Sequence, residues 1–212
     1  MIIFVISSYY LIKDFLEYKS SNNSNNKLID DVFIESNIEK DNKEKETIDW
    51  NKLLEINEDI IGWIKIENTN INYPILQDND NLKYLKHSYK GSYNSNGSIF
   101  TLNNEPFNDN ITTIYGHNMK NGIMFSELSK YMNKIFLDEH STITIYTKEE
   151  NNIKLLDFEN EIEYYKKASK YSIDNIGEIK KIIKLSTCSY LNNHTTPTDQ
   201  RYYVIAKLEK VD

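Results

Sequence analysis

Apolar and polar positions divide the chain into an N-terminal segment and a domain that begins near residue 47. Residues 2–11 are mostly apolar, and residues 13–46 are polar and charged without a sustained apolar period. A membrane-spanning helix needs about 20 apolar residues, so the first run is either the end of an anchor that starts upstream or a buried segment. We interpret residues 1–12 as a truncated membrane-anchor remnant, residues 13–46 as a polar linker with a weak helix, and residues 47–212 as the folded domain.

From residue 47 onward, short apolar runs separated by polar turns predict strands. An Asn-Thr-Asn turn at residues 68–70 separates the first two, because asparagine tolerates left-handed backbone. Many short strands without a βαβ rhythm predict a mainly β fold, a closed or partly open β-barrel with peripheral helices and an N-terminal helix. The predicted strands cover residues 61–67, 71–76, 97–102, 110–115, 141–147, 179–187 and 202–211.

Four segments of the domain have helical spacing. Thr47 is a candidate cap for a short helix that begins near Trp50. Residues 80–89 form a predicted helical turn, residues 124–136 an amphipathic helix, and residues 155–171 a further helix. The side chains expected to face inward are Leu82, Leu85, Phe125, Leu128 and Met132.

Charge and composition restrict the function. The formal net charge is −7, and no lysine-rich face with interleaved aromatic residues is visible, which argues against a nucleic-acid partner. Arg201 is the single arginine among 25 basic residues. In a chain with so strong a bias toward lysine, this arginine is a candidate for a role that needs its fork of hydrogen-bond donors.

Cys188 is the only cysteine, so an internal disulfide is excluded. From residue type alone a buried structural cysteine is the favoured reading, because free cysteine is among the most buried residue types. The position of Cys188 favours a catalytic role, because it ends a predicted strand just before the polar segment 189–200. A nucleophilic thiolate would also need a proton partner and donors for an oxyanion.

His117 and Arg201 are the candidate partners. His117 follows a predicted strand, and the flexible Gly116 before it allows the chain to turn. Arg201 begins the last strand, across the polar segment from Cys188, so two paired strands could present both side chains together. A histidine in a loop or an arginine at a strand start is more often a solvated surface group, and His87, His140 and His194 are weaker candidates.

Other kinds of site lack support. Glu159, Glu161 and Glu163 alternate along a predicted helix and do not form a facing acid and base pair. The metal and nucleotide motifs HExxH, CxxC, the P-loop and GxGxxG are missing from the sequence, so we expect no metal and no cofactor.

Taken together, these segments resemble the sortases, membrane-anchored cysteine transpeptidases of Gram-positive bacteria. "LSTC" at residues 185–188 matches the family's TLxTC signature except that Lys184 replaces the first threonine, and "YGHN" at residues 115–118 matches its histidine motif. The class B branch is most similar, through "NTNINYPILQDNDNLKYL", "GSIF" and "YGHNMKNGIMFSEL". The likeness covers about residues 48–148 and 179–210.

The resemblance implies a mechanism and a location. Cys188 would attack a threonine carbonyl in a sorting signal of the NPxTN or SPxTG kind, His117 would transfer protons, and Arg201 would hold the substrate or the oxyanion. The residues implied to line the substrate groove are Asn81, Tyr115, Ser186 and Thr187. The implied partners are surface proteins that carry the signal, an amine of the cell-wall peptide, and the cell membrane through a single N-terminal anchor, with the catalytic domain outside the cell.

Two departures from the family pattern keep alternatives open. A strand before the helix at residues 155–171 is missing from the predicted elements, which would leave an open barrel edge, and the interval from Cys188 to Arg201 is longer than usual. A cysteine hydrolase of peptidoglycan peptides is the first alternative. A non-catalytic, sortase-like surface module is the second.

Overall fold

A computed structural model provides the coordinates of the chain. It describes residues 2–36, 45–79, 82–102, 104–148, 167, 169–171, 179–188 and 201–209. The helix predicted at residues 155–171 falls almost entirely outside these ranges, so that prediction is not tested.

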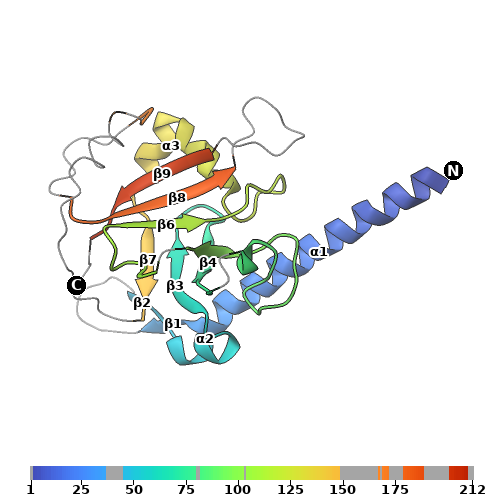
Figure 1. Cartoon of the computed structure of the whole chain (residues 1–212), viewed down its shortest axis with the longest axis horizontal. Coiled ribbons are helices and arrows are strands. Elements are labelled where there is room, and N and C mark those ends of the chain that lie inside the picture. The colour runs from blue at the N-terminus through green and yellow to red at the C-terminus, as the bar shows by residue number, and fades with distance from the viewer. Residues whose placement is uncertain are drawn as a thin grey trace.

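The described strands form one curled sheet of seven and a separate pair. The order in the large sheet is β7-β3-β4-β5-β6-β8-β9, so β7 and β9 are its edges (Figure 1). The curled sheet is a half-barrel with helices around it, which confirms the predicted mainly β, partly open barrel. Its strands are β3 (Ile60–Lys65), β4 (Asn72–Leu76), β5 (Ile99–Thr101), β6 (Ile111–Tyr115), β7 (Thr144–Thr147), β8 (Ile182–Cys188) and β9 (Arg201–Lys207).

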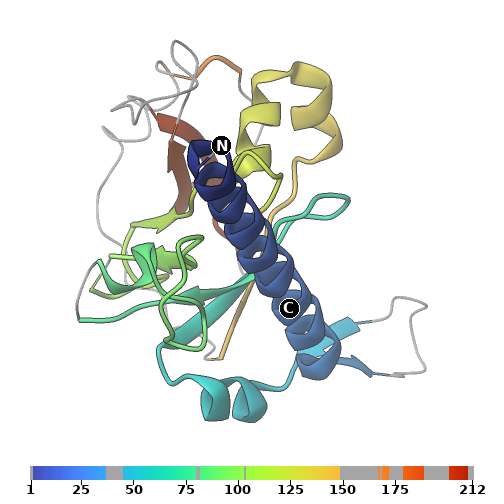
Figure 2. The ribbon, with the colours of Figure 1, turned by 90° about the vertical axis from the view of Figure 1, so that its right-hand side faces the viewer.

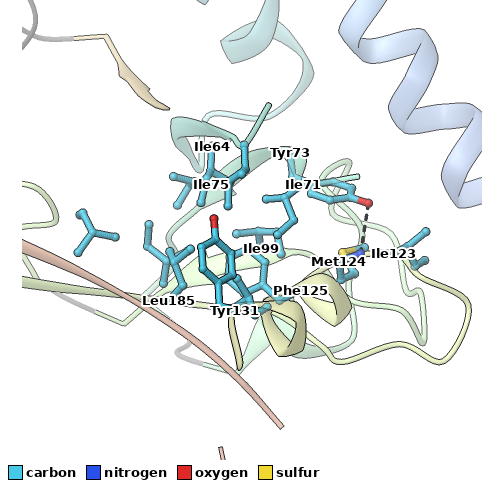
Figure 3. Packing of buried hydrophobic residues seen from close by; sticks show 14 of the residues in the cluster. Ile64, Ile71, Tyr73, Ile75, Ile99, Ile123, Met124, Phe125, Tyr131 and Leu185 are labelled. Carbon is cyan, nitrogen blue, oxygen red and sulfur yellow. Dashed lines mark hydrogen bonds between the residues drawn. The ribbon is translucent and has the colours of Figure 1, made fainter. Parts of the chain in front are cut away.

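Both faces of the central strands are covered. Successive residues of a strand point to opposite faces, and in β3 the neighbours Trp63 and Ile64 belong to two different hydrophobic clusters. Figure 3 shows the cluster that contains Ile64, packed with Phe125 of the segment before the 3-10 helix η2 (Ser126–Met132). This double burial explains why several strands read as continuous apolar runs rather than as strict alternation.

The N-terminal segment is a longer helix than the weak one that the sequence predicted. Residues 13–32 belong to one helix, α1 (Ile2–Val32), which projects beyond the sheet in Figure 1 and runs across the front of the molecule in Figure 2. Leu28 and Val32 are buried against the second cluster, and this burial makes the end of α1 part of the fold. The chain continues through β1 (Phe33–Ser36), which pairs antiparallel with β2 (Lys45–Ile48).

The first half of α1 carries exposed apolar side chains. The part of the chain that the structure describes holds no helix with the length and hydropathy needed to cross a bilayer. The large apolar residues exposed along this half are Phe4, Val5, Ile6, Tyr9, Tyr10, Leu11, Ile12, Phe15 and Leu16.

Three predictions about helices need correction. Thr47 lies in β2, and the cap of α2 (Trp50–Ile56) is Asp49, whose side chain accepts a hydrogen bond from the Lys52 amide at 3.1 Å. The amphipathic helix predicted at residues 124–136 is interrupted, because Asn133 has extended backbone and caps a second helix, α3 (Lys134–Glu139).

The third correction concerns which side chains face inward. In the 3-10 turn η1 (Lys83–Leu85), Tyr84 is buried, whereas Leu82 is 66% exposed. A 3-10 turn has three residues per turn, which changes the face that an α-helical pattern predicts. Met132 is also partly exposed, whereas Phe125 and Leu128 are buried as predicted.

Candidate active site

The site lies where two parallel strands end side by side. β6 pairs parallel with β8 and places Tyr115 opposite Ser186, and the Gly116 amide donates to the Ser186 carbonyl at 3.2 Å. His117 lies two residues after Tyr115, and Cys188 lies two residues after Ser186. Because parallel strands end at the same edge of a sheet, the two chain positions lie at one edge.

Cys188 and Arg201 are opposite residues of an antiparallel pair. β8 and β9 are in register from Ile182 with Lys207 to Cys188 with Arg201. The predicted pairing of these two strand ends is therefore confirmed at the level of the backbone. Arg201 is exposed.

His117 is held by the backbone around it. Its Nε2 lies 2.8 Å from the Leu85 carbonyl oxygen, and its own carbonyl accepts from the Phe125 amide at 3.0 Å. A carbonyl oxygen can only accept, so Nε2 carries the proton in this contact and Nδ1 is the nitrogen left for other partners. The ring is half-buried.

Ion pairs and hydrogen bonds stabilise the turn that presents the Leu85 carbonyl. Lys83 Nζ forms ion pairs with Asp59, at 2.8 Å, and with Asp78. Tyr84 OH donates to Asp59 at 2.5 Å and accepts from Asn57 Nδ2 at 2.8 Å. Hydrogen bonds to Asp59 and Asp78 raise the pKa of Lys83, and burial raises the pKa of Tyr84.

Two glycines allow close packing near His117, one against the imidazole and one against the core. A Cβ on Gly97, which has φ of +61°, would lie 2.6 Å from the Leu85 carbonyl oxygen and 3.1 Å from His117 Cδ2. A Cβ on Gly116 would lie 2.5 Å from Ile99 Cδ1 and 2.7 Å from Phe125 Cγ. We expected Gly116 to provide a turn, but its φ is not positive, and its role is to leave room for the core.

The predicted groove residues have different environments. Tyr115 is half-buried and stacks on Phe100, with the ring centroids 5.6 Å apart. Ser186 is 3% exposed and Thr187 is 2% exposed. Among the described residues, Thr187 Oγ1 has no hydrogen-bond partner. The burial of Ser186 and Thr187 does not favour contact with a peptide, so their place in the groove stays a prediction. Asn81 lies outside the described residues.

The remaining histidines of the described residues have structural contacts. His87 Nδ1 donates to the Lys83 carbonyl at 2.7 Å, and His140 stacks on Phe136 with centroids 3.9 Å apart. His194 lies outside the described residues. Within the described ranges, no three His, Cys, Asp or Glu side chains gather in a group able to hold a metal ion.

Sequence reasoning missed the groups that position His117. Leu85 acts through its carbonyl, which no sequence motif reveals, and the ion pairs of Lys83 join residues from different turns. A signal was present for Gly97, because a glycine between polar turn residues and a strand is typical of a close backbone approach.

The chain is similar to known proteins of one family. The model of the sortase domain family matches residues 64–209. Sortase B of Listeria monocytogenes is 38% identical over 160 residues, which are 64% of this chain and 65% of that protein. Sortase B of Staphylococcus aureus is 30% identical over 100% of this chain and 94% of that protein.

Solved structures agree with this result. Sortase B from B. anthracis, in complex with AAEK1, has a TM-score of 0.72 at 27% identity and covers 93% of this chain and 100% of its own. The Staphylococcus aureus sortase B–substrate complex has a TM-score of 0.60 at 31% identity, with 77% of this chain and 85% of its own covered.

Proposed function

The chain belongs to the sortase family, and we propose that it cleaves a C-terminal sorting signal of the NPxTN or SPxTG kind and joins the surface protein to a cell-wall amine. Class B sortases are cysteine transpeptidases, and the relatives reported above are of this class. The observation that supports the assignment to these residues is the terminal register pair of Cys188 with Arg201, beside the strand end that leads to His117.

In the first half-reaction, the Cys188 thiolate attacks the threonine carbonyl carbon of the signal. The tetrahedral intermediate collapses when the carbon–nitrogen bond breaks, and the His117 imidazolium gives its proton to the leaving amine. The product is a thioester between Cys188 and the surface protein. Nδ1 is the nitrogen proposed for this transfer, because Nε2 is engaged with the Leu85 carbonyl.

In the second half-reaction, an amine of the cell-wall peptide attacks the thioester carbon. Neutral His117 takes the proton that the amine loses, and the carbon–sulfur bond breaks to restore the thiolate and the imidazolium. No net redox change occurs, and one amide bond is exchanged for another.

Arg201 is proposed to stabilise the charge that develops on the carbonyl oxygen. Opposite residues of an antiparallel pair have Cβ atoms about 5 Å apart, which suits a guanidinium that must reach an oxygen bonded to the carbon under attack. Charge-assisted hydrogen bonds from a guanidinium are among the stronger ones available to a protein.

Membrane attachment is part of the proposal. The sortase family is associated with the cell surface. The exposed apolar side chains along the first half of α1 support contact of this segment with the membrane. The catalytic domain would then stand outside the cell, on the membrane side from which wall precursors are supplied.

The test is a ligation assay. The chain is incubated with a fluorogenic sorting-signal peptide, with and without a glycine oligomer as amine. We expect cleavage in both cases and a ligated product, identified by mass, only with the amine. Cleavage without any ligated product supports the hydrolase alternative, and failure to cleave a panel of such peptides supports the non-catalytic alternative.

A further inference from the structure

A cleft of about 490 Å³ lies between α1 and the loop of residues 88–98. In Figures 1 and 2 this loop, drawn in green, lies against the helix. The volume is within the range of roughly 300–1,000 Å³ that is typical of small-molecule sites. The active-site proposal does not use this cleft.

The lining of the cleft is unusually rich in neutral polar groups. Its walls include six serines, three asparagines and three tyrosines, against three charged residues. Hydroxyl and amide groups can both donate and accept hydrogen bonds. A ligand whose own groups do the same, and which carries no net charge, is the best chemical complement.

Two tyrosines give the cleft flat surfaces as well. Tyr93 is 71% exposed and meets the His87 ring edge to face, with centroids 6.0 Å apart. Tyr89 is half-buried, and its OH lies 2.8 Å from Ser24 Oγ. A sugar ring has apolar carbon–hydrogen faces and polar hydroxyl edges. An exposed tyrosine ring can pack against a face, and the neighbouring hydroxyl and amide groups can form hydrogen bonds with the edge.

The walls of the cleft are joined by specific hydrogen bonds. Glu17 accepts from the Ser95 amide at 2.8 Å, and Asn94 Nδ2 donates to Ser21 Oγ at 2.8 Å. Asn25 Nδ2 donates to the Asn72 carbonyl at 3.1 Å. A pre-formed cleft loses less conformational freedom when a ligand binds, so weak polar contacts suffice for measurable affinity.

The far wall adjoins the catalytic histidine. Gly97 lines the cleft, and a Cβ on it would be 3.1 Å from His117 Cδ2. Met124 lines it too and forms a bridge with Asn118, the residue after His117. A ligand in the cleft therefore lies one backbone segment away from the imidazole.

From this chemistry and position we propose that the cleft binds a neutral saccharide, the glycan part of the cell-wall acceptor. The saccharide site stands on the cleft itself, whereas its assignment to the acceptor rests on the proposed function. A sugar held there would bring its attached peptide amine toward His117 and the thioester.

Binding is measured first. The ¹⁵N-labelled full chain is titrated with N,N′-diacetylchitobiose up to about 10 mM, a range that detects weak affinities, and amide shifts are followed by NMR. We expect shifts at residues 20–25 and 88–98. Ser20→Trp, which adds an indole at an exposed lining position, and Tyr93→Ala should each weaken binding about tenfold.

Matched variants act as controls. Asn23→Trp places the same indole on an exposed position of α1 that does not line the cleft, and Tyr10→Ala removes an exposed tyrosine elsewhere on the helix. Both should bind as the parent chain does. Absence of shifts at the cleft, or equal affinity in Ser20→Trp and Asn23→Trp, overturns the saccharide site.

The acceptor role has its own readout. With a disaccharide–peptide amine, Ser20→Trp should raise the acceptor KM about tenfold. With the same peptide amine lacking the sugar, the acceptor KM of Ser20→Trp should equal that of the parent chain. If the variant and the parent chain have equal KM values for both acceptors, the acceptor role is overturned even if the sugar binds. If the chain binds the sugar but ligates no amine, the proposed function is contradicted and the saccharide site is not.

Discussion

His117 donates a hydrogen bond from Nε2 to the Leu85 carbonyl oxygen, 2.8 Å away, across 32 positions of the sequence. This contact joins the strand end of β6 to the turn η1, and it determines which nitrogen of the ring is available for proton transfer. The chemistry proposed for this sortase therefore depends on a turn that carries no reactive group of its own.

Gly97→Ala tests this dependence. The added methyl group would meet the Leu85 and Tyr84 carbonyl oxygens at 2.6 and 2.9 Å and displace the acceptor of His117. We expect kcat to fall by about tenfold or more, because misplacing a catalytic group by an ångström has effects of this size or larger. The measurement is steady-state peptide cleavage together with the melting temperature.

Gly91→Ala is the matched control for this variant. Gly91 also has positive φ, at +77°, but no atom lies within 4 Å of a Cβ placed there. It should show the backbone strain of about 1 kcal/mol without loss of kcat. Equal kcat in the two variants would contradict the positioning role of this turn.

Cys188→Ala should lower peptide cleavage by about 10³-fold or more, because covalent catalysis is lost while substrate binding remains. The melting temperature should stay within a few degrees of that of the parent chain, since one methyl replaces one thiol at the end of β8. Cleavage at the parent rate in this variant would remove the basis of the proposed mechanism.

Arg201→Lys should lower kcat about tenfold or more, although the charge is kept. A lysine ammonium is a point charge without the planar fork that can hold a carbonyl oxygen and a second acceptor together. Rates are compared with those of Lys207→Arg, which makes the reverse exchange on the same strand and should be nearly neutral. If Arg201→Lys is as active as the parent chain, the guanidinium has no role in the reaction.

Lys83→Met should lower the free energy of unfolding by about 1 kcal/mol, because two carboxylates would lose the cation between them at a partly exposed site. The kcat should fall as well, since η1 presents the acceptor of His117. Lys86→Met is the control, because Lys86 follows the same turn and is exposed. Denaturant unfolding of both variants, at equal salt, gives the comparison.

Stability should fall steeply in alkali. Burial raises the pKa of Tyr73 to about 12, and burial also raises that of Tyr131 to about 12. Below pH 10 each phenol is protonated in both the folded and the unfolded chain, so the full contribution of the buried neutral phenols to the free energy of unfolding is present. Between pH 10 and 12 the unfolded chain loses the proton first, and stability is lost as the pH rises.

Tyr73→Phe isolates one of these groups. The free energy of unfolding of the parent chain should fall by about 2 to 3 kcal/mol more than that of the variant between pH 9 and 12. Tyr73 OH also accepts from the Met124 amide at 3.2 Å, as Figure 3 shows, so the variant should be slightly less stable at neutral pH. Parallel pH profiles of the two proteins would refute the assignment.

Local patterns predicted several elements because strand alternation and turn chemistry act over a few residues. The strands around Trp63 and Ile75 were predicted to within two residues at each end, and Asn68 has the left-handed φ of 58° expected of its turn. Where tertiary packing decided the outcome, the predictions were wrong or incomplete. Leu82 faces solvent because Tyr84 fills the core, and the weak helix predicted after residue 13 is part of one continuous helix whose end is buried at Leu28 and Val32.

The sequence by itself identified the candidate reactive residues, because Cys188, His117 and Arg201 stand at predicted strand ends and few other groups compete with them. The sequence also predicted that the strand ends of Cys188 and Arg201 could pair, but only the tertiary structure gave their exact register and the contact of His117 with the Leu85 carbonyl. The first depends on the register between two neighbouring strands, and the second depends on how the turn η1 packs beside the end of β6. A contact between distant parts of the chain is set by the packing of everything between them, which no local pattern of residues encodes.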